Sequence, residues 1–299
     1  MAREVAIFIK SFRPDFEALG QLVDSIETFA RVPLPVVVSV PAADEAVLID
    51  RIGRTRVRIV RDEDYAGGRD GLTGWEHQQV CKLSAWRLGL AETLFSIDSD
   101  SYFIRPFGPE TFLSANGRPQ LVMSRLRAVF RATNQALVAR LLENVAPTPV
   151  ERPPATIGKG DGPDLRPWLA EALADRWADT HVKRARLSAI FSRSGGHFHA
   201  MPGAILDTRL LRDLHDRFIA PQGLTMRDLI LICPWEYDWQ LEWALATGFD
   251  FDPCEPLLFH VDSEVGHAEA MALGISEAHV ARHFHGIAMA SRHLARLRF

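Results

Sequence analysis

The chain has few cysteines and no long apolar run. Its 299 residues include only three cysteines, Cys81, Cys233 and Cys254. They are odd in number and far apart, which excludes a disulfide framework and the paired spacing of a zinc site. No stretch approaches the roughly 20 apolar residues of a membrane span. The short apolar run 5–9 is followed at once by Lys10, unlike a secretory signal. These absences predict a protein of the reducing cytoplasm.

An excess of charge of one sign is also lacking. The 34 lysines and arginines nearly balance 38 aspartates and glutamates, for a net charge of −4. That balance excludes nucleic-acid binding driven by neutralisation of phosphates. No internal repeat is present, which excludes a solenoid. The composition is that of an ordinary globular protein, and the length suits one large α/β domain or two small ones.

Strand and helix patterns alternate along the first third of the chain. Short stretches rich in apolar residues predict four strands, at 5–9, 34–40, 57–60 and 93–97, and the first and the last of them are expected to be buried. Apolar residues at helical spacing predict three helices between them, at 15–30, 43–52 and 75–90. Elements that alternate in this way predict βαβ units and a mostly parallel sheet flanked by helices.

The second half is less regular. A stretch rich in proline and glycine, 146–167, predicts a loop or the joint of a small subdomain. A single helix is expected at 168–190, and the tail 276–299 is expected to be mostly helical. The other expected elements are strands at 120–124 and 199–206, helices at 133–143, 209–218 and 235–246, and an extended segment at 249–261.

Two aspartates, Asp98 and Asp100, follow the apolar strand 93–97. Ligands of a parallel sheet bind at the carboxyl ends of its strands, and residues i and i+2 of an extended segment point to the same side. Two converging carboxylates repel each other unless a cation lies between them. Oxygen ligands suit magnesium or manganese, which can in turn hold a diphosphate. The alternative is that Asp98 caps the next turn and Asp100 is a solvated surface residue.

Two longer motifs surround these aspartates. The sequence reads GWEHQQVCKL at 74–83 and IDSDSYFIRPF at 97–107. The Asp-Ser-Asp resembles the Asp-x-Asp signature of GT-A type glycosyltransferases. The two motifs together resemble a bacterial group of glycosyltransferase-like proteins, which carry a GWxxQQxxKL helix before a DSD strand end. The match covers about the first third of the chain, with a thinner likeness at 202–207.

The resemblance implies a GT-A (Rossmann-like) α/β fold in one domain, 1–299. The half 1–124 would bind a nucleotide-sugar, and the half 125–299 would bind the acceptor, with a helical insertion near 146–192. The implied activity is metal-dependent transfer of a sugar, with a UDP-linked donor favoured, to a glycan, lipid or small-molecule acceptor. Two alternatives stay open: a nucleotidyltransferase, although residues 10–14 lack the glycines of its phosphate loop, and an inactive relative that binds a sugar or nucleotide.

Four residues of the first motif, Trp75, Gln78, Gln79 and Lys82, are spaced i, i+3, i+4 and i+7 and share one helix face. Beside a metal–diphosphate site this face is expected to contact the nucleotide, with Lys82 near phosphate or ribose. The alternative is a solvated helix face with Trp75 as a core anchor.

Strand ends supply further nucleotide contacts. Lys10, Ser11 and Arg13 follow the first strand, where the resemblance implies that the base and ribose lie. Asp62 follows the third strand and would accept a hydrogen bond from base or ribose, or cap the glycine-rich loop. Ser99, between the two aspartates, is counted with the nucleotide contacts, as is Asp98.

His285 is expected to complete the metal shell of Asp98 and Asp100, because the resemblance implies a late histidine that returns to the metal. Imidazole beside carboxylates is a suitable manganese ligand set. His260, His197 and His199 are rival histidines.

The segment WEYDW at 235–239 carries two acids among three aromatic residues. A carboxylate is the usual general base for an acceptor hydroxyl, and aromatic faces pack against sugar rings. Glu236 and Asp238 are therefore both candidates for the base. The alternative is the acidic first turn of a helix, whose Trp235, Trp239 and Trp243 form a core stripe.

The basic C-terminal residues Arg292, Arg296 and Arg298 alternate with apolar ones. A peripheral contact with the inner face of an anionic membrane is one interpretation of this pattern, and a helix that covers the end of the domain is the other.

Overall fold

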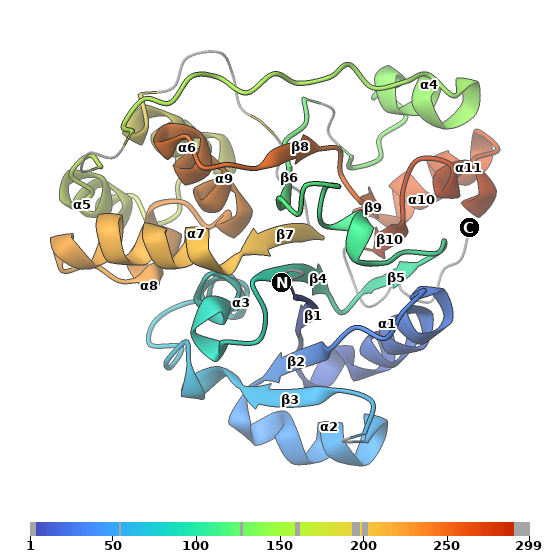
Figure 1. The fold of residues 1–299 in the computed structure, drawn as a ribbon, viewed down its shortest axis with the longest axis horizontal. Helices are drawn as coiled ribbons and strands as arrows, with labels where there is room; N and C mark the ends of the chain where they lie inside the picture. The colour runs from blue at the N-terminus through green and yellow to red at the C-terminus, as the bar shows by residue number, and fades with distance from the viewer. Residues whose placement is uncertain are drawn as a thin grey trace.

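A five-stranded sheet forms the centre of the computed structural model, which describes residues 4–53, 55–125, 128–158, 162–192, 198 and 203–289 (Figure 1). The strand order is β3-β2-β1-β4-β7. The first four strands run parallel, and β7 runs antiparallel to β4. The bounds are β1 Val5–Lys10, β2 Val36–Val40, β3 Arg58–Arg61, β4 Thr93–Asp98 and β7 Ala204–Asp207. The predicted mixed α/β fold with a mostly parallel sheet is confirmed, and it is consistent with a Rossmann-like arrangement.

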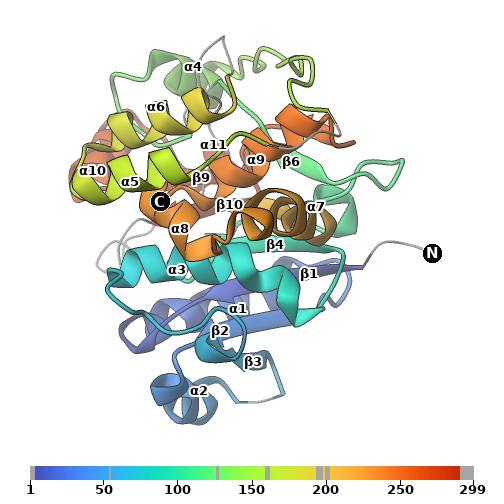
Figure 2. The same cartoon turned by 90° about the vertical axis from the view of Figure 1, so that its left-hand side faces the viewer.

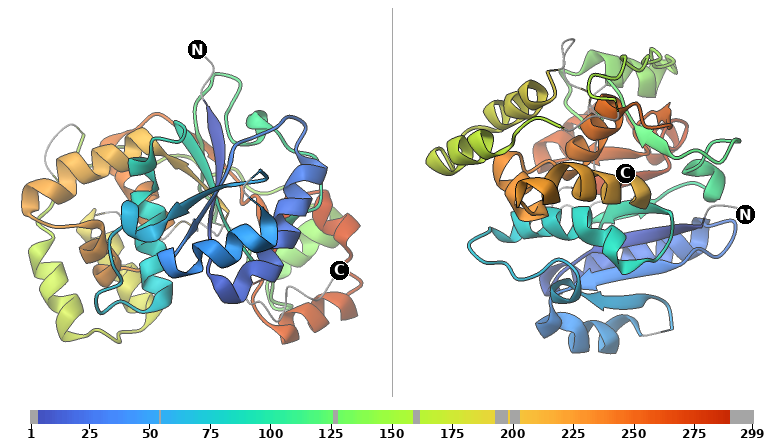
Figure 3. Two further views of the ribbon diagram at one scale, coloured as in Figure 1. Left: turned by 90° about the horizontal axis from the view of Figure 1, so that it is seen from below. Right: turned by 60° about the vertical axis from the view of Figure 1, so that its left-hand side comes forward.

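Helices cover both faces of this sheet, as the complete burial of β1 requires. The helices of the first half are α1 Phe16–Phe29, α2 Glu45–Ile52 and α3 Gly74–Ser84. Helix α3 lies between the sheet and α8, Met226–Ile232 (Figure 2). In the right-hand view of Figure 3, the blue and cyan elements that precede β4 lie below the orange and red elements near the end of the chain.

A smaller three-stranded sheet follows directly from β4. Its strands are β5 Ser101–Phe103, β9 Leu258–Val261 and β10 Gly286–Met289, in the order β5-β10-β9. Strand β10 runs antiparallel to β5. The Asp-Ser-Asp therefore lies where the chain passes from the large sheet to the small one. A third pairing joins β6 Gln120–Val122 to β8 Asp252–Cys254.

Helices make up most of the second half. They are α4 Gln135–Glu143, α5 Arg166–Ala174, α6 Thr180–Ile190, α7 Thr208–Asp213, α9 Glu236–Thr247, α10 Glu264–Ala272 and α11 Glu277–Ala281. A π-helical turn spans Leu214–Ile219. Short 3-10 turns span Arg13–Asp15, Ala42–Asp44, Asp62–Asp64, Ala85–Leu88, Pro109–Thr111 and Ala220–Gln222. In the part of the chain that the structure describes, no helix has the length and apolarity needed to span a bilayer.

Several predicted bounds in the second half are wrong. The helix expected at 168–190 is two helices, because α5 ends at Ala174 and α6 begins at Thr180. Helices α8 and α10 of this half are not predicted by the sequence patterns, and neither is the short strand β5 of the first half. Short apolar runs do not distinguish strand from helix by periodicity alone. The tail expected to be helical contains α11 and then strand β10, and the basic residues of 290–299 lie outside the described part of the chain.

Candidate functional site

The start of α3 is set by a capping box. The Oγ1 atom of Thr73 accepts a hydrogen bond from the backbone N–H of Glu76 at 3.2 Å, and the Glu76 carboxylate accepts one from the backbone N–H of Thr73 at 2.8 Å. Satisfying these two donors fixes where the helix begins. With the helix beginning at Gly74, Gln78 and Lys82 lie on the face of α3 that is directed toward the end of β4.

Lys82 joins three elements of the structure. Its Nζ lies 2.7 Å from Oδ1 of Asp98 on β4 and 2.9 Å from Oε1 of Glu236 on α9. Gln78 donates to the same Asp98 oxygen at 2.9 Å. Burial opposes the charged form of Lys82, but the carboxylates of Asp98 and Glu236 outweigh it and hold its pKa well above the usual value. The side chain of Lys82 is only 2% exposed and is paired with two carboxylates, and its expected contact with nucleotide stays a prediction.

Asp100 carries a carboxylate that lacks such a cation. Burial, and then the charges of Asp98 and Asp15, raise the pKa of Asp100 well above its usual value. Among the residues that the structure describes, no basic side chain forms an ion pair with it. Asp15, at the start of α1, had not been singled out, although its place just after the first strand was a usable signal. The charges of Asp98 and Asp15 thus act on Asp100 at the carboxyl edge of the sheet, and Asp98 and Asp100 are the candidates there for holding a divalent cation. Within the described residues, the group of three side chains whose ligand atoms lie within 4.8 Å of one another is Asp62, His77 and Cys81.

Lys10 and Asp62 pair with each other at the neighbouring strand ends. Nζ of Lys10 lies 3.0 Å from Oδ2 of Asp62, and Ser39 donates to Oδ1 of Asp62 at 2.5 Å. Both charged side chains are buried. Ser11, the third residue of this strand end, has a buried Oγ with no hydrogen-bond partner within the described ranges. Arg13 is exposed, and its backbone N–H donates to Asp44.

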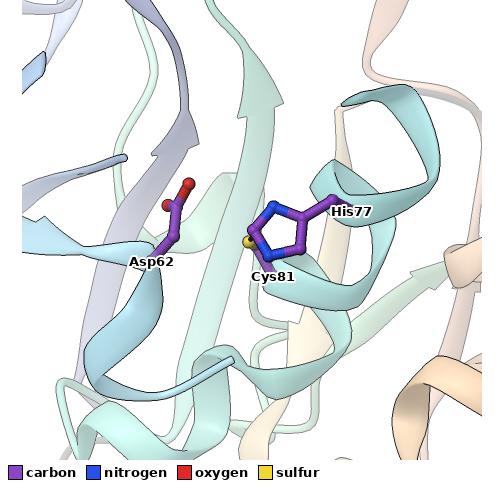
Figure 4. Close-up of side chains that lie close together, drawn as sticks. All are labelled: Asp62, His77 and Cys81. Atoms are coloured by element: carbon purple, nitrogen blue, oxygen red, sulfur yellow. Dashed lines mark hydrogen bonds between the residues drawn. The ribbon is translucent and has the colours of Figure 1, made fainter. Parts of the chain in front are cut away.

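A buried Asp-His-Cys cluster lies beneath this edge. Ligand atoms of Asp62, His77 and Cys81 lie within 4.8 Å of one another, a set that could hold a metal ion (Figure 4). His77 and Cys81 face Asp62 from successive turns of α3, and their i, i+4 spacing within the GWEHQQVCKL motif is the sequence signal for this cluster. The oxygens of Asp62 are already engaged by Lys10 and Ser39. Burial, followed by the charge of Asp62, raises the pKa of the Cys81 thiol and disfavours the thiolate that a metal needs.

His285 is not brought to the aspartates. The register of β10 against β5 places Gly286 opposite Phe103, and the N–H of Met289 donates to the carbonyl of Asp100. His285 therefore lies at the far end of this ladder, with its Nε2 3.1 Å from Nη2 of Arg105. The register of β10 thus brings Met289 to Asp100 and places His285 beside Ile104, so the structure as described does not bring His285 to the aspartates as expected. Of its rivals, His260 lies on β9, whereas His197 and His199 are outside the described residues.

The environment of His285 predicts an acid-labile contact. Burial and the neighbouring Arg105 lower the pKa of His285 to about 4. The unfolded chain binds this proton more readily than the folded one, so folding stability falls as the pH drops from 6.5 toward 4. We expect His285→Gln, which keeps an acceptor for Arg105, to flatten this loss. Thermal unfolding of both proteins across that window measures it, and parallel curves would contradict the assignment.

The acids of the aromatic segment begin α9, and both are buried. Glu236 is paired with Lys82, and burial raises its pKa against the opposing effect of that lysine. Asp238 lies 3.3 Å from Nε of Arg184. Trp239 and Trp243 are fully buried, so this part of the core-stripe interpretation is correct. Neither acid faces solvent, and the general-base role stays a prediction.

Trp75 is an exposed ring at the edge of this region. Its side chain is 45% exposed and meets Trp235 edge-to-face at 5.3 Å between ring centroids. Arg184 covers Trp235 at 4.3 Å from the ring centroid. Trp75 is thus no core anchor. Gln79 is buried and donates to the carbonyl of Trp75, and Ser99 is also buried, so neither presents its side chain to solvent.

Neither a protein-family model nor a curated protein sequence matches the chain.

Proposed function

We propose that the protein is a metal-dependent glycosyltransferase of GT-A type with a nucleotide-sugar donor. The observation that carries the proposal is the placement of Asp98 at the carboxyl end of β4 and of Asp100 in the turn that follows, not in an extended segment as the i, i+2 argument expected. Asp100 has a raised pKa and no ion pair with a described basic side chain. Such an edge is where ligands of open parallel sheets bind. A UDP-linked donor is favoured because such donors predominate among the enzymes that the sequence resembles.

Residues at the strand ends and on α3 would bind the metal or position its ligands. Asp98 and Asp100 would hold magnesium or manganese. When bound, the metal supplies positive charge that neutralises the departing diphosphate. Gln78 and Lys82 fix the orientation of the Asp98 carboxylate through its Oδ1 atom. Ser11 offers an unpartnered buried hydroxyl at the end of β1.

The acceptor side would be formed by the aromatic pair and the start of α9. Trp75 presents an exposed ring from the same helix that holds Asp98 through Gln78. A sugar ring stacked on it would lie close to the donor edge. Glu236 and Asp238 remain the two candidates for the general base. Burial raises the pKa of Glu236, which is the direction that a general base requires.

Calorimetric titration with UDP, GDP, CDP and ADP, each with manganese and with chelator, tests this function. We expect one diphosphate, UDP by preference, to bind with manganese and to lose its binding in chelator. Binding that is unaffected by chelator would support the inactive sugar- or nucleotide-binding relative instead. Absence of binding by all four under both conditions would refute the proposal.

A further inference from the structure

Lys82 is shared between two carboxylates of different elements. Its distances to Asp98 and Glu236, 2.7 and 2.9 Å, are nearly equal. The side chains of Lys82 and Glu236 are 2% and 4% exposed, whereas that of Asp98 is 25% exposed. The carboxylate of Asp98 is therefore partly accessible to solvent, whereas Lys82 and Glu236 are buried.

The ammonium is confined at this position. The ring of Tyr237 lies 5.2 Å from Nζ of Lys82, and the Tyr237 hydroxyl is itself anchored to Oγ of Ser96 at 3.0 Å. Charges that are buried in this way are screened little by salt. If Glu236 lost its negative charge, the Lys82 ammonium would have Asp98 as its remaining carboxylate partner.

We infer that Glu236 is a positioning residue, which draws the Lys82 ammonium toward itself and so keeps the Asp98 carboxylate available to a divalent cation. The inference rests on the proposed function, since it concerns the metal expected at Asp98 and Asp100. Without the charge on Glu236, Lys82 would pair with Asp98 alone and compete with the metal for that carboxylate. Glu236 would thus act on the metal from the far side of the lysine, without touching it.

Two variants separate this role from a general structural one. Glu236→Gln keeps the shape and an acceptor for Lys82 but removes the charge. Combining Lys82→Met with Glu236→Gln removes both charges and leaves Asp98 with its Gln78 hydrogen bond. Glu255→Gln is the control, because Glu255 has a similar pairing elsewhere, with Nη1 of Arg140 at 3.1 Å and Oγ of Ser124 at 3.0 Å.

The readout is the dissociation constant of Mn²⁺ alone, measured from the EPR signal of the free ion. We expect Glu236→Gln to weaken Mn²⁺ binding about tenfold. The double variant should regain the wild-type affinity or exceed it, and Glu255→Gln should not change it. Wild-type affinity in Glu236→Gln, or a double variant as weak as the single one, would overturn the inference. If the wild-type protein itself does not bind Mn²⁺, the metal-dependent function fails, and this result is distinct from the other two.

Discussion

Asp100→Asn is expected to lower metal-dependent nucleotide binding by about 100-fold or more. The substitution removes one of the two carboxylates that would hold the cation, and the neutral amide is a weaker ligand. Its backbone carbonyl, which accepts from Met289, is unchanged. Calorimetry with the preferred diphosphate and manganese measures the loss. The surface variant Asp250→Asn, which disturbs only an exposed pair with Arg118, should bind as the wild type does.

The same substitution is expected to raise the folding stability of the metal-free protein. The pKa of Asp100 is raised in the folded state by burial, Asp98 and Asp15. The folded chain therefore holds this proton more tightly than the unfolded chain. Stability falls as the pH rises from the usual value of 3.8 through the raised one. Asn cannot ionise, so the gain should be largest at neutral pH and vanish in acid. A variant less stable than the wild type at neutral pH would show that the carboxylate is already compensated.

Lys82→Met is expected to produce the largest loss of stability, about 3–5 kcal/mol at neutral pH. It leaves the carboxylates of Asp98 and Glu236 without their shared cation, and Glu236 is sealed in the interior. Replacing the lysine by an apolar chain of similar length keeps the packing, so the loss would report on charge. Urea unfolding of the single variant and of the combination with Glu236→Gln measures the difference. The combination should recover much of the stability.

Acid should rescue the single variant. Burial already raises the pKa of Glu236, and removal of Lys82 removes a charge that lowers it. A group with a raised folded pKa favours the folded state increasingly as the pH falls toward its usual value, 4.5 for this glutamate. The deficit of Lys82→Met relative to the wild type should therefore shrink as the pH is lowered from neutrality. A deficit that does not change with pH would point to lost packing instead of an unpaired charge.

Local sequence patterns determined the first half of the fold and the position of the carboxylates. The strands that precede Lys10 and Asp98 were predictable because each is a short apolar run that stops at a charged residue. The spacing of Gln78 and Lys82 placed both on one face of a helix, and both do contact Asp98. Periodicity reports on neighbours within a few turns of the same element, and these contacts depend on little else.

Only the tertiary structure decided which groups lie opposite one another across long stretches of chain. Glu236 reaches Lys82 across 154 residues because α9 packs on α3, and that packing depends on the whole core. The register of β10 against β5 separated His285 from the aspartates. The apolar pattern of so short a strand does not specify its partner, direction or register, so the sequence could not predict this separation. Side-chain spacing thus determined that Gln78 and Lys82 face the end of β4. Burial and long-range packing decided that Lys82 pairs with carboxylates and that Trp75 is exposed.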